Sequence, residues 1–195
     1  MPSPPPLILA STSPYRRLLL ERLGLGFTVE APGVEESRAA HEAPAARASR
    51  LAAAKAQAVA ARHPGAVVIA SDQVAAAGNT ILDKPGHAAA ARQQLGRLSG
   101  ASAHFHTACT VLHVESAFSA SHLDSTCVAF RTLEPAEIER YVLRERPLDC
   151  AGSFKAEGLG ISLLERIESD DPTGLIGLPL IWLAATLRSL GYLVP

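Results

Sequence analysis

Short apolar runs alternate along the chain with longer segments of mixed polarity, and prolines and glycines separate the two kinds of segment. The clearest apolar run covers residues 66–70, and another covers 7–10 directly after a group of prolines. Continuous apolar runs of this length are typical of strands that are buried on both faces. We therefore predict strands at 7–10 and 66–70, and a further strand at 27–30.

Helix-start and helix-stop signals mark the longer segments. Ser13 and Pro14 form such a start, because serine caps the first helical turn and proline is favoured at its first position. Pro64 and Gly65 end another helix, which begins at Pro44 and is rich in alanine. Five helices are predicted in all, at residues 14–23, 44–62, 87–98, 134–143 and 178–190.

The middle of the chain is predicted to form antiparallel strands. Gly78 and Asn79 favour a tight hairpin turn, and two long β-like segments follow at 103–114 and 117–130. Because other strands alternate with helices, we expect an α/β fold with a mixed central sheet flanked by helices. The sequence contains no internal repeat and no low-complexity linker, so residues 1–195 are expected to form one domain, whose first six residues are a proline-rich extension.

Composition excludes several classes of protein. Hydrophobic residues make up 48% of the chain and charged residues 19%, which permits a sizeable core and argues against disorder. The formal net charge is −1, whereas proteins that grip long nucleic acids usually carry a strong basic excess. The apolar stretch at 175–187 is too short to span a bilayer, and the N-terminus lacks the positive region of a signal peptide. We expect no nucleic-acid or membrane partner, which leaves small anionic ligands.

The three cysteines bear on the compartment. Cys109, Cys127 and Cys150 are an odd number without a CxxC pair, which excludes a disulfide framework and a zinc ribbon. Reduced, mostly buried cysteines are typical of cytosolic proteins. We therefore expect a cytoplasmic protein.

The segment between the first predicted strand and the first predicted helix is a candidate phosphate site. Free N–H groups and the positive end of the dipole make a helix start suitable for phosphate. The hydroxyl groups of Ser11 and Ser13 and the guanidinium of Arg16 would strengthen such a site. The alternative is an ordinary helix cap with exposed arginines.

A second candidate is Asp72, which follows the predicted strand at 66–70. A carboxylate just past the carboxyl end of a buried strand lies where open α/β sheets bind ligands. Asp72 could there activate a water molecule or hold a metal ion. The alternative is an aspartate that only forms a turn.

Three scattered charges complete the candidates. Glu36, Lys55 and Lys84 are weak individually, because most such residues are solvated surface groups. Together they would supply cations for the oxygens of a triphosphate and a carboxylate for a divalent metal.

Joined in order, these segments resemble the Maf family of nucleotide pyrophosphatases along almost the whole chain. The matching stretches are Leu7–Arg17, Glu36, Lys55-Ala56, Ser71-Asp72-Gln73, Lys84-Pro85, Phe130–Leu133, Tyr141, Pro147-Leu148, Ala151–Gly158 and Gly177–Leu180. Several separated motifs in the same order argue against chance similarity. The resemblance implies a Maf/ITPase-like α/β fold, with two lobes around a nucleotide-binding cleft, and a homodimer.

Carried over residue by residue, the resemblance also implies an active site. Asp72 matches the proton acceptor of the family. The other matching polar positions, which we expect to bind phosphates or metal, are Ser11, Arg16, Glu36, Lys55 and Lys84. The family needs a divalent cation, Mg²⁺ or Mn²⁺, which we expect Glu36 and Asp72 to bind, and we expect Ser13 to join the phosphate site.

Within the family, the chain most resembles the branch that acts on 7-methyl-GTP. The branch that acts on dTTP and UTP has arginine, threonine and glutamine where this chain has Tyr15, Gln73 and Glu157. Guanine offers two donors that the Glu157 carboxylate could accept. Methylation at N7 makes the purine cationic, which favours an aromatic face such as Tyr15 and a nearby negative charge.

We therefore expect hydrolysis of 7-methyl-GTP to 7-methyl-GMP and diphosphate, which would remove modified nucleotides. Two alternatives stay open at this point. One is a dTTP/UTP pyrophosphatase of the same family, and the other is a nucleotide-binding regulator of cell division without turnover.

Overall fold

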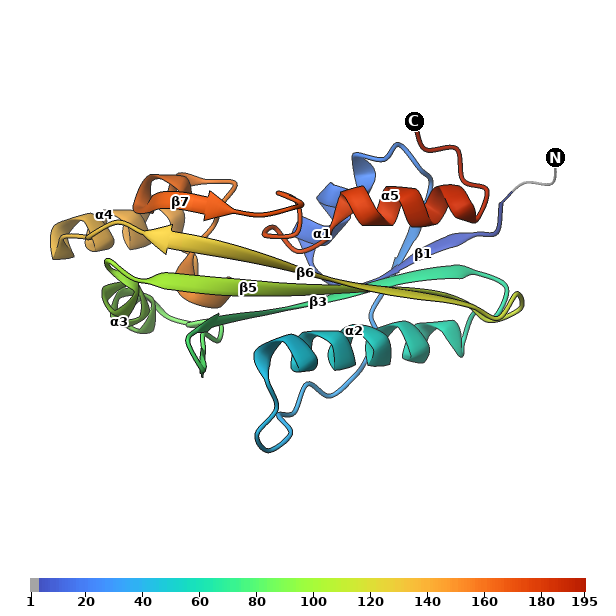
Figure 1. Cartoon of the computed structure of the whole chain (residues 1–195), viewed down its shortest axis with the longest axis horizontal. Coiled ribbons are helices and arrows are strands. Elements are labelled where there is room, and N and C mark those ends of the chain that lie inside the picture. Colours follow the sequence, from blue (N-terminus) through green and yellow to red (C-terminus); the bar gives the residue numbers. More distant parts are fainter. Residues whose placement is uncertain (1–3) are drawn as a thin grey trace.

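A computed structural model describes residues 4–195, which are built around one seven-stranded sheet (Figure 1). The strands are β1 Leu7–Ala10, β2 Thr28–Glu30, β3 Val67–Ala77, β4 Thr80–Ile81, β5 Ser102–His113, β6 Phe118–Phe130 and β7 Leu164–Glu168. Their order is β2-β1-β3-β5-β6-β7, and β4 pairs with β3. Because β1 is parallel to β2 and β3 while the other pairs are antiparallel, the predicted mixed sheet is confirmed. Half of the predicted N-terminal extension, residues 1–3, lies outside the described residues.

The five predicted helices are present near their expected positions. They are α1 Pro14–Glu21, α2 Pro44–Ala60, α3 Ala88–Leu98, α4 Pro135–Glu145 and α5 Leu180–Ser189. Two short 3-10 turns, η1 Ala151–Ser153 and η2 Leu159–Leu163, precede β7. The N-cap of α1 is Ser13, as predicted, and its hydroxyl accepts a hydrogen bond from the amide of Arg16. Within residues 4–195, no helix is long and apolar enough to cross a membrane.

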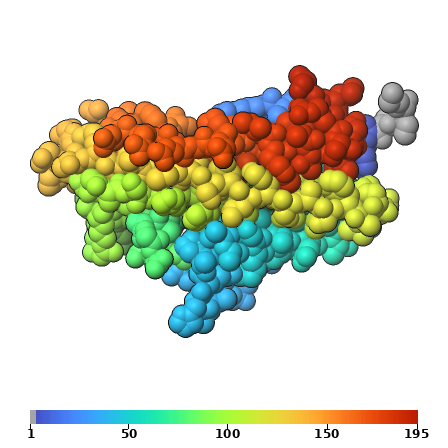
Figure 2. All heavy atoms as spheres, in the orientation of Figure 1, coloured from blue at the N-terminus to red at the C-terminus, as the bar shows by residue number. Residues whose placement is uncertain are grey.

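The helices cover the sheet on both faces and divide the molecule into two lobes (Figure 1). In β1, Ile8 packs with the alanine-rich face of α2, whereas its neighbour Leu9 packs with α1 and α5 on the opposite face. A separate hydrophobic cluster lies at the other end of the sheet, where α3 and α4 pack on β5 and β6 around Phe105 and Phe130. Figure 2 shows the elongated outline that results. The α/β fold with two lobes is therefore as expected.

The path of β3 corrects one prediction. Asp72 was expected just past the end of a strand at 66–70, but β3 continues to Ala77 and holds Asp72 in its middle. The strand extends this far because it pairs with β5 from Val68 to Ala76. On its other edge it meets β1 only at 67–69 and β4 only at 76 and 77.

This second edge of β3 is open between residues 70 and 75, where no strand in the described part of the chain covers it. We call it the open edge of β3. Side chains of successive strand residues point to opposite faces. Beside an edge that no other strand covers, side chains from both faces of the strand can line one pocket, as Asp72 and Gln73 do here.

Candidate active site

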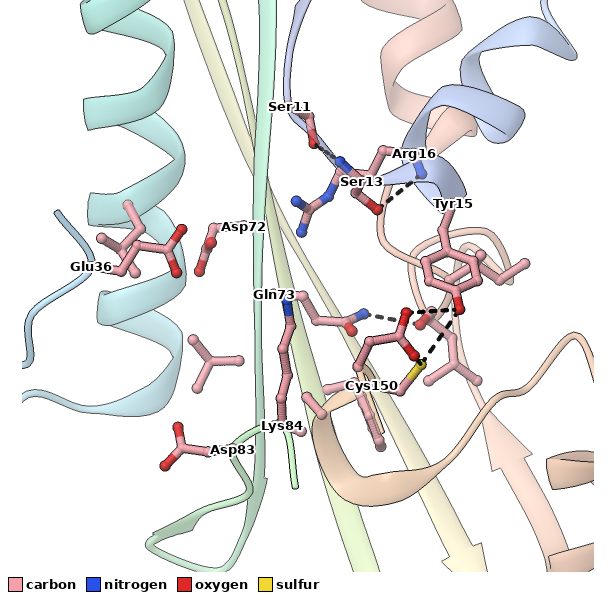
Figure 3. A pocket seen from close by; sticks show the side chains of 18 of the residues that line it. Ser11, Ser13, Tyr15, Arg16, Glu36, Asp72, Gln73, Asp83, Lys84 and Cys150 are labelled. Atoms are coloured by element: carbon pink, nitrogen blue, oxygen red, sulfur yellow. Dashed lines mark hydrogen bonds between the residues drawn. The ribbon is translucent and has the colours of Figure 1, made fainter. Parts of the chain in front are cut away.

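A pocket of about 540 Å³ lies beside the open edge of β3 (Figure 3). Its walls come from the start of α1, the loop before α2, one face of α2, the segment after β4 and residues 149–157. All the candidates from the sequence line it, namely Ser11, Ser13, Tyr15, Arg16, Glu36, Lys55, Asp72, Gln73, Lys84 and Glu157. Residues far apart in the sequence therefore meet in one place, which supports the set without assigning a role to each member.

Lys55 connects two carboxylates in this pocket. Its Nζ lies 2.6 Å from Asp72 Oδ1 and 2.6 Å from Glu36 Oε1. Lys55 and Asp72 are buried, whereas the side chain of Glu36 is 54% exposed. In the view of Figure 3, Asp72 lies between Glu36 and Arg16. The centre of the pocket thus holds two carboxylates and at least two cations.

The two carboxylates differ in their affinity for a proton. Burial raises the pKa of Asp72, and the charges of Lys55 and Arg16 offset this only in part. Burial also disfavours the charged form of Glu36, but its hydrogen bond with Lys55 and the charge of Lys55 outweigh burial and leave its pKa below the ordinary value. Glu36 therefore stays ionised, while Asp72 is suited to take up a proton. Two neighbouring carboxylates with diverging pKa values are a common feature of acid–base sites.

The segment around α1 supplies hydroxyl groups and a guanidinium. Ser11 Oγ accepts from the amide of Ser13 at 3.1 Å, and Ser13 Oγ accepts from the amide of Arg16 at 3.4 Å. The ordinary capping role of Ser13 is thus present, but each hydroxyl keeps a hydrogen that it can donate. Arg16 Nε donates to the carbonyl of Gly177 at 2.9 Å, which leaves its terminal nitrogens for an anionic ligand.

A loop that precedes α5 holds several of these side chains through its backbone. We call residues 171–177 the carbonyl loop. The carbonyl of Gly177 accepts from Ser71 Oγ at 2.8 Å as well as from Arg16. Gln73 Nε2 donates to the carbonyls of Gly174, at 3.1 Å, and Leu175, at 2.9 Å. Because a backbone carbonyl cannot donate, these bonds fix the orientation of the amide and leave Gln73 Oε1 as an acceptor.

The end of the pocket away from Glu36 contains Tyr15, with Cys150 beside it (Figure 3). The hydroxyl of Tyr15 donates to Asp149 Oδ2 at 3.2 Å. Burial and the neighbouring Cys150 and Asp149 raise the pKa of Tyr15, so its hydroxyl stays protonated. Glu157 is an exposed residue of the same wall. The pocket therefore has one part with the charged groups around Lys55 and another, which we call the aromatic end, with Tyr15, Asp149 and Cys150.

Arg47 and Asp149 are among the polar pocket residues that the sequence reasoning missed. Arg47 donates from Nη2 to the carbonyl of Glu36 at 3.1 Å, and its buried Nε has no hydrogen-bond partner. The spacing of Arg47, Leu51 and Lys55 by four residues could have revealed that they share one face of α2. Asp149 lies in an irregular segment, where no periodicity indicates the direction of a side chain.

Glu36 and Asp72 also suit a partial metal site. Within residues 4–195, no group of three or more His, Cys, Asp or Glu side chains is positioned to hold an ion. Mg²⁺ typically binds one or two carboxylates together with substrate phosphates and water. The second oxygens of Glu36 and Asp72, which are not the ones bonded to Lys55, fit that set of donors.

The mixed sheet and the helices around it form an α/β fold that is shared with a solved structure. A solved structure, "Structure of a HAM1 protein from Coxiella burnetii", is similar over 94% of this chain and 98% of that chain, with a TM-score of 0.53. At 14% identity, this likeness shows the fold alone. The family model described as Maf-like protein matches residues 6–190, and the chain belongs to the Maf family.

Relatives in the family are similar over nearly their whole length. A protein of Xanthomonas oryzae pv. oryzae (strain MAFF 311018) is 56% identical, over 98% of this chain and 100% of the relative. A protein of Aromatoleum aromaticum (strain DSM 19018 / LMG 30748 / EbN1) is 53% identical, over 97% of each chain. Both relatives are named 7-methyl-GTP pyrophosphatase.

Proposed function

We propose that this protein is a nucleoside triphosphate pyrophosphatase that hydrolyses 7-methyl-GTP to 7-methyl-GMP and diphosphate. The observation that carries the proposal is the buried Asp72, with its raised pKa, next to Lys55 and Arg16 in a pocket of nucleotide size. The names of the similar proteins from Xanthomonas and Aromatoleum support the substrate.

In the proposed reaction, a water molecule attacks the α-phosphorus while Asp72 accepts its proton, and diphosphate leaves. Lys55, Lys84 and Arg16 stabilise the negative charge on the phosphates, and Ser11 and Ser13 donate hydrogen bonds to them. Glu36 and Asp72 would hold Mg²⁺ or Mn²⁺, which supplies further charge neutralisation when bound.

At the other end of the pocket, the base is proposed to lie against Tyr15. Guanine presents its N1–H and 2-amino groups as donors, so its edge needs acceptors. Glu157 offers a carboxylate, and Gln73 offers Oε1 because its amide nitrogen is already bound by the carbonyl loop. These acceptors favour guanine over the edge of uracil or thymine, which presents two carbonyl oxygens.

The cellular setting is also a proposal. The three cysteines, all of them within the described residues, are free, which agrees with a reducing compartment such as the cytoplasm. We propose a cytoplasmic enzyme that acts on a free nucleotide, without a nucleic-acid or membrane partner, as a homodimer.

Two measurements test the proposal. Values of kcat/KM for 7-methyl-GTP, GTP, dTTP and UTP should be highest for 7-methyl-GTP, and a higher value for dTTP or UTP would indicate the other branch of the family. Asp72→Asn should lower turnover by about 10²- to 10⁴-fold while the fold survives. Saturable nucleotide binding without release of diphosphate from any of the four would instead favour a binding regulator.

A further inference from the structure

We propose that Asp149 is a further specificity-determining residue, which makes the pocket prefer a nucleotide whose base carries a positive charge. The inference rests on the proposed function and concerns the charge of the ring rather than the hydrogen-bonding edge of the base. It assigns to Asp149 the negative charge that a cationic purine requires next to an aromatic face.

Three charged or aromatic groups lie close together at the aromatic end of the pocket. Asp149 Oδ2 accepts from the hydroxyl of Tyr15 at 3.2 Å, and Asp149 Oδ1 lies 3.8 Å from Lys155 Nζ. Lys155 Nζ in turn lies 5.9 Å from the centroid of the Tyr15 ring. Tyr15 and Asp149 line the pocket, whereas Lys155, which is also a described residue, does not. The aromatic ring therefore already has one cation before any base binds.

The ammonium of Lys155 disfavours a second cation at the ring of Tyr15. A lysine ammonium within about 6 Å of a ring is attracted by its quadrupole, and it repels another positive charge placed against the same ring. N7-methylated guanine would be such a second charge. An unbalanced Lys155 would cancel part of the attraction that Tyr15 offers to the base.

Asp149 removes this conflict because its carboxylate contacts both Lys155 and Tyr15. Burial opposes the ionisation of Asp149, but a backbone hydrogen bond and the charge of Lys155 outweigh it and hold the pKa below its ordinary value. The carboxylate is thus charged at neutral pH and balances Lys155. Its side chain is 58% exposed, so it can also face the bound base.

A comparison of two substrates separates recognition of the ring charge from recognition of the hydrogen-bonding edge of the base. GTP and 7-methyl-GTP share the N1–H and 2-amino donors that Glu157 and Gln73 would accept, and they differ in the methyl group and the ring charge. Because the methyl group is the same in every measurement, a change in the ratio of kcat/KM for 7-methyl-GTP to kcat/KM for GTP on removal of a protein charge reports on the charge of the base.

The experiment compares this ratio in the full-length protein and three variants. Asp149→Asn keeps an acceptor for Tyr15 but removes the charge, and it should lower the ratio by about 2- to 5-fold, as expected for a partly exposed ion pair. Lys155→Met should raise the ratio. Asp83→Asn is the matched control, because Asp83 lines the same pocket but pairs with Arg38 at 2.8 Å, and it should leave the ratio unchanged.

Each outcome decides the proposal. A ratio that falls in Asp149→Asn, and rises in Lys155→Met, supports it, and the difference should shrink with added salt. An unchanged ratio in Asp149→Asn overturns it. If that unchanged ratio comes with an equal loss of kcat/KM for both substrates, Asp149 only positions Tyr15. A wild-type protein without preference for 7-methyl-GTP over GTP would overturn the proposed substrate as well.

Discussion

Replacing Lys55 by methionine tests whether this buried lysine keeps Asp72 in its working protonation state. Methionine retains an unbranched apolar stem but lacks the ammonium that lies 2.6 Å from Asp72 Oδ1. Burial already raises the pKa of Asp72, and Lys55 is the strongest group that opposes this. Without Lys55 the pKa should rise further. A general base works only when deprotonated, so activity is lost as the pH falls through its pKa. The acidic limb of the pH profile should therefore move to higher pH.

The size of the shift in the acidic limb follows from the ion pair between Lys55 and Asp72. Two unit charges about 4 Å apart interact by about 4 kcal/mol at an effective dielectric constant near 20. Arg16 remains beside Asp72, and the half-exposed Glu36 admits water to the pocket, so we expect roughly a third to two thirds of that value. This corresponds to a rise of about 1 to 2 units in the pKa of Asp72.

The assay is release of diphosphate from 7-methyl-GTP across a range of pH at saturating Mg²⁺. Lys55 also faces the phosphates, so Lys55→Met should lower kcat/KM at every pH, but only the changed protonation of Asp72 moves the acidic limb. Lys84→Met is the control, because Lys84 is an exposed lysine of the same pocket. A limb that stays in place in Lys55→Met would refute the reasoning.

Gly174→Ala should strain the carbonyl loop, because an added Cβ would overlap the carboxylate of Asp124. We expect a loss of roughly 1–3 kcal/mol in the free energy of unfolding, and an unchanged urea midpoint would contradict this. Glu157→Gln should lower kcat/KM more for 7-methyl-GTP than for UTP, because an amide cannot accept both guanine donors as a carboxylate does. Equal losses would argue against contact with the base. Arg131 lowers the pKa of Glu137 from 4.5 to about 2, so the stability that this pair provides is present above 4.5 and is lost on protonation below it. Glu137→Gln should thus lower the melting temperature at neutral pH and lose this effect as the pH falls toward 2.

The strands and helices could be predicted because each element carries its own periodicity. In β1, for example, the whole apolar run is buried, and its residues alternate between the core clusters on the two faces of the sheet. The extent of β3 could not be predicted in this way. Ser71, Asp72 and Gln73 interrupt its apolar pattern, and their polar groups are satisfied by residues far away in the sequence. A local pattern cannot reveal such partners.

The residues of the candidate site could be proposed as a set from the sequence, but the contacts among them could not. The burial of Lys55 depends on how α2 lies against β3, since the same lysine on an exposed face would be an ordinary surface group. The hydrogen bonds to the carbonyl loop could not be predicted from the sequence either, because the acceptors are backbone carbonyl groups, which every residue type carries. The contacts of Asp149 with Tyr15 and Lys155 could not be predicted for a similar reason, since they depend on how an irregular segment folds.

The open edge of β3 bears on how substrate preference can diverge within the family. Asp72 and Gln73 are adjacent in the chain, yet they have separate partners: Asp72 is bound by Lys55 of α2, and Gln73 by Thr107 of β5 and the carbonyl loop. An exchange at position 73, such as the threonine that the resemblance implies for the dTTP and UTP branch, would therefore remove contacts of Gln73 but not the contact between Asp72 and Lys55. Under the proposed function, the contacts of this chain with the base could therefore change at position 73 without loss of the contact between Lys55 and the proposed proton acceptor.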